Sequence, residues 1–402
     1  MNHLVLSIDH RAEGNATHRT LKLDGDGVSV RCEFHLPGLE LPPPRCLDGF
    51  LIGILFRLLS GRRPVHVDGA LTKTCLRNVT ELQGAWSLWR PGKYAPFPIT
   101  ARELIDTDLP SIKSAVCAFS GGVDSGFSLV RHAGKLLGEA SLPVRSAVLV
   151  HGFDIPFSNT ESFERIAARC RSNVEPFGID LITIRTNIRE ESRQRWDDSY
   201  AAQLACCLHQ LDGIADGAVI GSAHSYDMQV FPQGSTPATD HRLGGGIFSI
   251  FNDGATHSKT AKVATIAKYP ELTRTLRFCW EGKDPEANCG SCEKCLRTYV
   301  HLRAVGVDNP ECMPIPSLEQ LAHIPTPSPA LLNQIRRALD YARAHDRNGE
   351  WLRAAERSVR AYDNALRLKS VKSELGGLPY LGPLLRGVYR VGKTFAGMAV
   401  RP

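Results

Sequence analysis

The chain has 402 residues, of which 43% are hydrophobic and 22% charged, and its net charge at neutral pH is +6. This composition is typical of a globular protein and excludes a disordered or fibrous chain, while the length predicts two or three domains. The longest apolar run, Phe50 to Phe56, is far shorter than the roughly 20 residues of a membrane-spanning helix, and the N-terminus has no signal-peptide pattern. We therefore expect a cytoplasmic protein without a transmembrane segment.

Residues 1–105 are predicted to form an α+β accessory domain. Three runs with partial alternation and Gly/Asp turns, "HLVLSID", "RTLKLDG" and "GVSVRCEFHL", indicate antiparallel strands, and a helix is expected at about Leu47 to Leu59. Prolines interrupt the pattern at "LPPPR" and again at "WRPGKYAPFP". We place the domain boundary at the second interruption.

Residues 106–310 are predicted to form an α/β domain. Short apolar runs such as "SAVCAF", "RSAVLVHGF", "DLITIRT" and "GAVIGSA" alternate with helical segments. Apolar runs without strict alternation are typical of strands covered on both faces, and strand-helix-strand order predicts a parallel sheet with helices on both faces. Ligands bind at the carboxyl ends of such strands, where Ser120, His151 and Ser222 fall.

Residues 311–402 are predicted to form a basic helical tail. From residue 331 onward the sequence has 14 Lys and Arg against 6 Asp and Glu. A charge of this kind usually belongs to a solvated helix face, and it also suits an acidic partner, RNA or an anionic membrane surface.

The segment "AFSGGVDSG", residues 118–126, joins a predicted strand to a predicted helix. A glycine turn at this position lets backbone N–H groups and the helix N-terminus approach one anion. Ser120 and Ser125 add hydroxyl donors, whereas Asp124 would repel a phosphate and so indicates Mg²⁺ or helix capping. The alternative is an ordinary Gly-Gly turn with Ser and Asp as caps.

The hexapeptide "SGGVDS" resembles the pyrophosphate-binding loop of the N-type ATP pyrophosphatases, or PP-loop enzymes. The resemblance implies an adenine nucleotide alpha hydrolase-like fold, ATP binding, and adenylation of a substrate with release of pyrophosphate. The loop residues it assigns to ATP are Ser120, Gly121, Gly122, Val123, Asp124 and Ser125. Independently of the resemblance, His151 and Asp154 stand just after the second predicted strand, and from this position we expect them to approach the adenosine or the acyl adenylate.

A second glycine motif, "GVYRVGKT" at Gly387 to Thr394, fits the pattern of a Walker A loop. A Walker A loop needs a buried strand before it and a helix after it. Here prolines stand upstream and eight residues remain, so we do not assign a P-loop NTPase.

Four cysteines, Cys279, Cys289, Cys292 and Cys295, follow the pattern C-x9-C-x2-C-x2-C. Four thiolates suit a closed, structural Zn²⁺ site. An iron-sulfur cluster is the rival, but Tyr299 stands at the position where a ferredoxin run has its fourth cysteine.

The cysteine pattern together with "SGGVDS" resembles the 7-cyano-7-deazaguanine synthase family, which converts a 7-deazaguanine carboxylate to an amide and then a nitrile. In that family a Lys-Thr segment stands where "HSKTAKVATIA" occurs here, which implies that Lys259 and Lys262 are cations near the phosphates. The residue after the loop departs from the family, because Gly126 replaces the usual Thr or Ser. An enzyme that stops at the amide therefore fits equally well.

The polar loop "GSAHSYDMQVFPQGSTPATDHRL" follows a predicted strand end, where substrate loops belong. His224, Tyr226, Ser235 and Asp240 are the candidates for substrate contact, although each is also an ordinary loop residue type. Taken together, the sequence suggests an ATP-dependent carbon-nitrogen ligase that uses ATP, Mg²⁺, a small-molecule carboxylate and an amine donor. The alternatives are a tRNA-modifying PP-loop enzyme and a non-catalytic ATP-binding scaffold.

Overall fold

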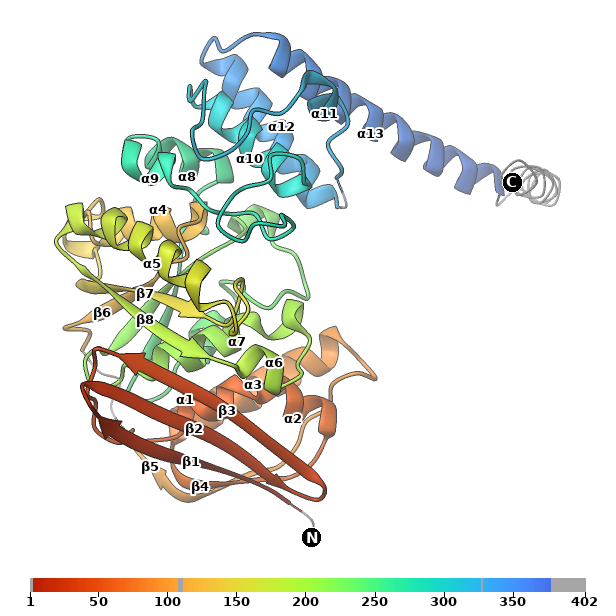
Figure 1. The fold of residues 1–402 in the computed structure, drawn as a ribbon. Helices are drawn as coiled ribbons and strands as arrows, with labels where there is room; N and C mark the ends of the chain where they lie inside the picture. Colours follow the sequence, from red (N-terminus) through yellow and green to blue (C-terminus); the bar gives the residue numbers. More distant parts are fainter. Residues whose placement is uncertain (1–2, 108–110, 327, 377–402) are drawn as a thin grey trace, which may run out of the picture.

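The computed structural model describes residues 3–107, 111–326 and 328–376. Its strands are β1 Leu4–Glu13, β2 Ala16–Gly25, β3 Val28–Pro37, β4 Val65–Thr72, β5 Ile99–Ile105, β6 Ala115–Ala118, β7 Val144–His151, β8 Asp180–Thr186, β9 Gly217–Gly221 and β10 Ser249–Asp253. They form one ten-stranded sheet in the order β10-β9-β6-β7-β8-β3-β2-β1-β4-β5 (Figure 1).

Most neighbouring strands of the sheet are parallel. The pairs from β10 through β8 are parallel, as are β1-β4 and β4-β5, whereas β8-β3, β3-β2 and β2-β1 are antiparallel. The predicted parallel strands and the predicted antiparallel N-terminal strands are thus confirmed. The sequence did not indicate β4, β5 or β10, nor the pairing of Phe34 with Thr186 that joins the N-terminal strands to the same sheet. The predicted boundary near residue 105 falls at the end of β5.

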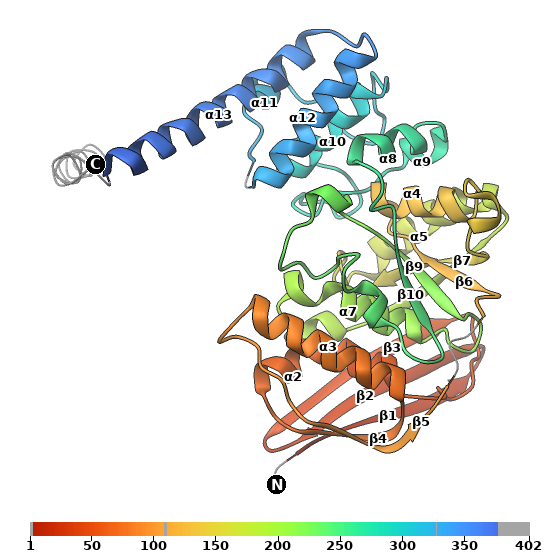
Figure 2. The ribbon, with the colours of Figure 1, turned by 180° about the vertical axis from the view of Figure 1, so that it is seen from behind.

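The helices lie on both faces of the sheet and at its upper end (Figures 1 and 2). They are α1 Asp48–Gly53, α2 Leu55–Gly61, α3 Lys73–Trp89, α4 Val123–His132, α5 Thr160–Val174, α6 Ile188–Glu191, α7 Trp196–His209, α8 Lys259–Ile266, α9 Pro270–Arg274, α10 Glu293–Ala304, α11 Leu318–Ala322, α12 Pro329–Ala344 and α13 Glu350–Gly376.

The helix expected at Leu47 to Leu59 is divided at Ile54 into α1 and α2. The first part packs very closely on α7. A Cβ at Gly49 would lie 2.3 Å from Cβ of His209, and one at Gly53 would lie 2.7 Å from Cβ of Cys206. Glycine at these two positions therefore allows the two helices to approach each other.

The side chains of the central strands are buried in two separate hydrophobic cores, one on each face of the sheet. In β6, Val116 and Ala118 pack with the N-terminal strands and α7, whereas Ala115 and Cys117 pack with α4 and α5. Side chains that are buried on both faces explain why this strand has an apolar run without alternation.

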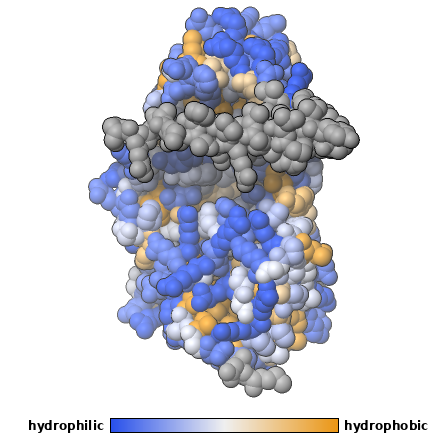
Figure 3. Space-filling view, turned by 90° about the vertical axis from the view of Figure 1, so that its right-hand side faces the viewer, coloured by the Kyte–Doolittle hydropathy of each residue, from blue (hydrophilic) through white to orange (hydrophobic). Residues whose placement is uncertain are grey.

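A third core lies in the C-terminal helical region, where Tyr299, Ile335 and Trp351 are buried between α10, α12 and α13. The helical C-terminal prediction is confirmed for the described residues, while the segment Gly387 to Thr394 lies outside them. Helix α13 projects from the body (Figures 1 and 2). The face on that side is mostly hydrophilic, with hydrophobic residues in small patches (Figure 3). Within the described ranges, no helix has the length and apolar character needed to cross a membrane.

Candidate functional site

The segment Ser120 to Ser125 forms a tight turn between β6 and α4. Gly121 has a φ of +76°, a left-handed conformation that favours glycine. The N–H of Ser120 donates to Oγ of Ser125 at 3.2 Å, which fixes the turn. Helix α4 begins after Gly122 without a side-chain cap, so the positive end of its dipole faces the loop. The turn has the local geometry of an anion-binding site.

A cavity of about 290 Å³ lies beside this turn, at the carboxyl ends of the parallel strands. The segments that follow β6, β7 and β9 all contribute to its wall. The polar residues that line it are Ser120, Asp124, Ser125, Asp154, Ser235, Lys259, Arg277, Lys294, Arg297 and Thr298. The cavity is therefore placed where the strand pattern predicts a ligand.

Asp124, on the first turn of α4, is held by two lysines of α8. Nζ of Lys259 lies 2.5 Å from Oδ2 of Asp124, and Nζ of Lys262 lies 3.1 Å from Oδ1. Burial on its own would raise the pKa of the Asp124 carboxyl, but the two ammonium groups outweigh burial and lower this pKa to about 2. Burial lowers the pKa of Lys259 to about 8, although Asp124 opposes the shift.

Three further cations lie in the cavity wall: Arg277, Lys294 and Arg297. The backbone N–H of Arg277 donates to the carbonyl oxygen of Gly121 at 3.0 Å, and its guanidinium lies 3.6 Å from Asp154. Burial lowers the pKa of the Lys294 ammonium. Cations thus outnumber the two carboxylates of the wall, and the cavity favours an anionic ligand.

An aromatic wall faces the cavity on the side of α7. It consists of Phe153, Trp196 and Tyr200, all of which line the cavity. The ring centroids of Phe153 and Trp196 are 5.0 Å apart, and the guanidinium of Arg189 lies 4.2 Å from the Trp196 ring centroid. A planar ring fits against such a surface.

Only part of the predicted substrate loop reaches the cavity among the described residues. Ser235 lines the cavity and donates to Oδ2 of Asp240 at 2.6 Å. Asp240 is fully buried behind Ser235, and burial raises its pKa. Tyr226 is 64% exposed and lies outside the cavity. Burial, followed by the charge of Lys259, lowers the pKa of His224 to about 4, so this ring is neutral at pH 7.

His151 is buried behind the cavity wall. Its Nε2 lies 3.0 Å from the carbonyl oxygen of Pro156, and its ring stacks on Phe163 at a centroid distance of 4.3 Å. The structure therefore does not bring His151 to the cavity, whereas it does place Asp154 there.

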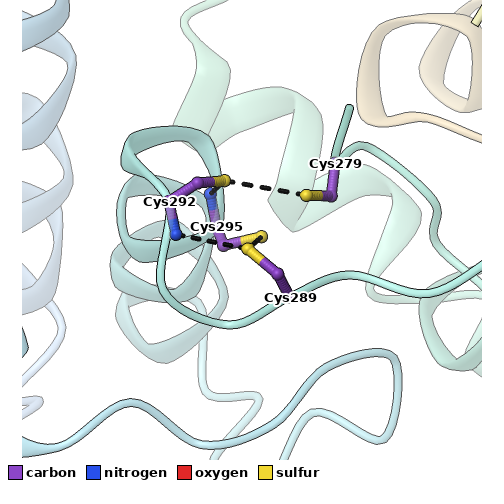
Figure 4. A group of neighbouring side chains, drawn as sticks. All are labelled: Cys279, Cys289, Cys292 and Cys295. Atoms are coloured by element: carbon purple, nitrogen blue, oxygen red, sulfur yellow. Dashed lines mark hydrogen bonds between the residues drawn. The ribbon is translucent and has the colours of Figure 1, made fainter. Parts of the chain in front are cut away.

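The four cysteines form one compact cluster, with all four sulfur atoms within 4.8 Å of one another (Figure 4). Sγ of Cys279 lies 3.7 Å from Sγ of Cys292, and Sγ of Cys289 lies 3.8 Å from Sγ of Cys295. A tetrahedron with Zn–S bonds of about 2.3 Å has sulfur-sulfur edges of about 3.8 Å. The cluster could hold a metal ion such as zinc, and its all-thiolate donors match that ion.

Sequence analysis did not identify Arg277, Lys294 and Arg297. A signal was nevertheless present, because each of these cations stands within two residues of one of the four cysteines. The aromatic residues of α7 carried no comparable signal, since polar and apolar residues alike are buried along this helix.

Compared with known proteins, the chain matches no protein-family model, no curated protein and no solved structure. Its function is therefore inferred from the chemistry of the cavity and of the cysteine cluster.

Proposed function

We propose that the chain is an ATP-dependent ligase of the PP-loop type, with an adenine nucleotide alpha hydrolase-like core. A carboxylate oxygen of the substrate attacks the α-phosphorus of ATP, the bond to the β-phosphate breaks, and pyrophosphate leaves with the bonding electrons. An amine then attacks the acyl adenylate, AMP leaves, and the amine loses a proton as the carbon-nitrogen bond forms. Adenylation divides one difficult condensation into two easier steps.

The observation that carries the proposal is the convergence of the glycine turn and four cations on one cavity. Backbone N–H groups at the start of α4 suit the leaving pyrophosphate, and Lys259, Arg277, Lys294 and Arg297 would neutralise its charge. The aromatic wall supports a planar acid, and the resemblance suggests 7-deazaguanine carboxylate as the first acid to test.

Asp124 is the residue that would hold Mg²⁺, since one carboxylate together with phosphate oxygens is a common magnesium environment. The ion would supply charge neutralisation at the phosphates. Asp124 itself holds the ammonium groups of Lys259 and Lys262 at the edge of the loop.

The experiment is incubation of the full chain with radiolabelled ATP, Mg²⁺, an amine donor and a panel of carboxylates, including 7-carboxy-7-deazaguanine. AMP and pyrophosphate are resolved from ADP and phosphate. We expect AMP that depends on one carboxylate and is lost in Asp124→Ala. Release of ADP would refute the adenylation chemistry, and ATP binding without turnover for any acid would favour the scaffold hypothesis.

A further inference from the structure

The cysteine cluster and the cavity share their chain segments. Arg277 stands two residues before Cys279, Lys294 stands between Cys292 and Cys295, and Arg297 stands two residues after Cys295. All three cations line the cavity. The two segments that supply the sulfur ligands therefore also supply most of the cations that face the proposed phosphates.

The first of these segments touches the glycine turn directly. The N–H of Arg277 donates to the carbonyl oxygen of Gly121 at 3.0 Å, and its Nε donates to the carbonyl oxygen of Pro285 at 2.8 Å. The buried Asn288 accepts hydrogen bonds from the N–H groups of Phe278 and Cys279 at 2.9 and 3.0 Å. The position of Arg277 is thus tied to the backbone that carries two of the sulfur ligands.

The second segment is the first turn of α10. Sγ of Cys292 accepts from the N–H of Cys295 at 3.4 Å and so caps the helix. Nζ of Lys294 lies 4.4 Å from the ring centroid of Trp280, the residue after Cys279. Lys294 therefore contacts both ligand-bearing segments, and it also lines the cavity.

We propose that a metal ion in the cysteine cluster assembles the anion site, so that metal binding and phosphate binding are thermodynamically coupled. Phe278 and Cys279 already pack in the same core as α10, and an ion bound to all four sulfur atoms would add a direct link between the segment 277–279 and the start of this helix. With the ion bound, Arg277, Lys294 and Arg297 are held at one side of the glycine turn. This inference rests on the proposed function, because it concerns the same phosphate site.

The test uses inorganic pyrophosphate as the probe and the full chain, either loaded with Zn²⁺ or stripped by a chelator. Calorimetric titration gives the dissociation constant. We expect stripping to weaken pyrophosphate binding by at least about tenfold, since the loss of one charge-assisted hydrogen bond already has an effect of that size. Coupling is reciprocal, so saturating pyrophosphate should raise the Zn²⁺ affinity of the protein by the same factor, measured by competition with a chromophoric chelator and corrected for the Zn²⁺ that free pyrophosphate binds.

Two variants keep the test independent of any unfolding of the stripped protein. In zinc-loaded Lys294→Ala, pyrophosphate binding should weaken about tenfold or more and the reciprocal effect on Zn²⁺ should shrink. Lys283→Ala removes an exposed lysine from the loop between Cys279 and Cys289, and this lysine does not line the cavity. In this variant the pyrophosphate affinity and the effect of pyrophosphate on Zn²⁺ affinity should both match the wild type.

Two results would overturn this inference and leave the proposed function standing. One is an equal pyrophosphate affinity in the loaded and the stripped protein, and the other is a Zn²⁺ affinity that pyrophosphate does not change. Failure of the loaded wild-type protein to bind pyrophosphate would overturn both.

Discussion

Replacing Asp124 with asparagine removes the negative charge between two lysines while keeping the side-chain volume. The Asp124 carboxyl has a pKa of about 2, against an ordinary value of 3.8. At about 1.4 kcal/mol per pKa unit, the shift corresponds to about 2 to 3 kcal/mol of folding stability at pH 7. The variant also leaves the ammonium of Lys262, which is 1% exposed, with only neutral acceptors, namely the amide oxygen of the new asparagine and the Ser222 carbonyl oxygen. We therefore expect Asp124→Asn to lower the free energy of unfolding by about 3 kcal/mol.

Urea unfolding of both proteins at pH 7 measures this difference, and its pH dependence checks the cause. A carboxyl with a depressed folded-state pKa stabilises the fold fully above its unfolded pKa near 4, and that stabilisation is lost as the pH falls toward 2. The difference in the free energy of unfolding between wild type and variant should therefore disappear as the pH falls from about 4 to 2.

Asp227 provides a matched control. Its pKa is also about 2, because it pairs with Arg337, but its side chain is 58% exposed. Solvent screening should hold the cost of Asp227→Asn below about 1 kcal/mol. A cost below about 1 kcal/mol for Asp124→Asn at pH 7, or a difference from the wild type that persists unchanged at pH 2, would show that the Asp124 charge does not stabilise the fold through the two lysines.

Three further predictions concern the turn, the metal cluster and the pH profile. Gly121→Ala should lower the free energy of unfolding by about 1 to 2 kcal/mol in urea and weaken pyrophosphate binding in calorimetry, because the φ of +76° disfavours a side chain even though the nearest heavy atom would lie 3.7 Å from the new Cβ. Gly126→Ala, inside helix α4, should be neutral or stabilising. Equal losses in both variants would argue that the left-handed conformation of Gly121 has no particular importance. Cys295→Ser should lose zinc to a chelator that the wild type withstands, as measured by elemental analysis, whereas Cys312→Ser, outside the cluster, should retain it; equal retention in both would remove the metal assignment. Pyrophosphate binding, followed by calorimetry and corrected for the ionisation of pyrophosphate itself, should weaken as the pH rises through about 8, where Lys259 loses its proton; a corrected profile that stays flat to pH 10 would exclude Lys259 from the phosphate site.

The local sequence predicted those parts of the fold that depend on nearby residues. The runs that became β6 to β9 are apolar because each strand faces a core on both sides, as Val116 and Cys117 do. The cysteine cluster was also predictable, since three of its four ligands come from one short turn and helix start.

The parts that the sequence did not predict depend on long-range contacts. Pairing of β3 with β8 joins residues about 150 positions apart, and no turn signal marks it. His151 ends a strand as expected, but its ring stacks on Phe163 from α5 instead of facing the cavity, and strand position alone does not decide between these orientations. Lys294 and Arg297 line the cavity because α10 packs beside α8, and this contact joins residues that are far apart in the sequence.

In the proposed reaction a carboxylate oxygen attacks the α-phosphorus of ATP, and the transfer of that oxygen to AMP can be followed with an isotope. The carboxylate that supports AMP formation is labelled with ¹⁸O on both oxygens, and the AMP released with the amine product is analysed by mass spectrometry. We expect one ¹⁸O atom in each AMP, because the bridging oxygen of the acyl adenylate leaves with the phosphate. AMP without the label would show that water or another nucleophile attacks the phosphorus, and would contradict the proposed adenylation.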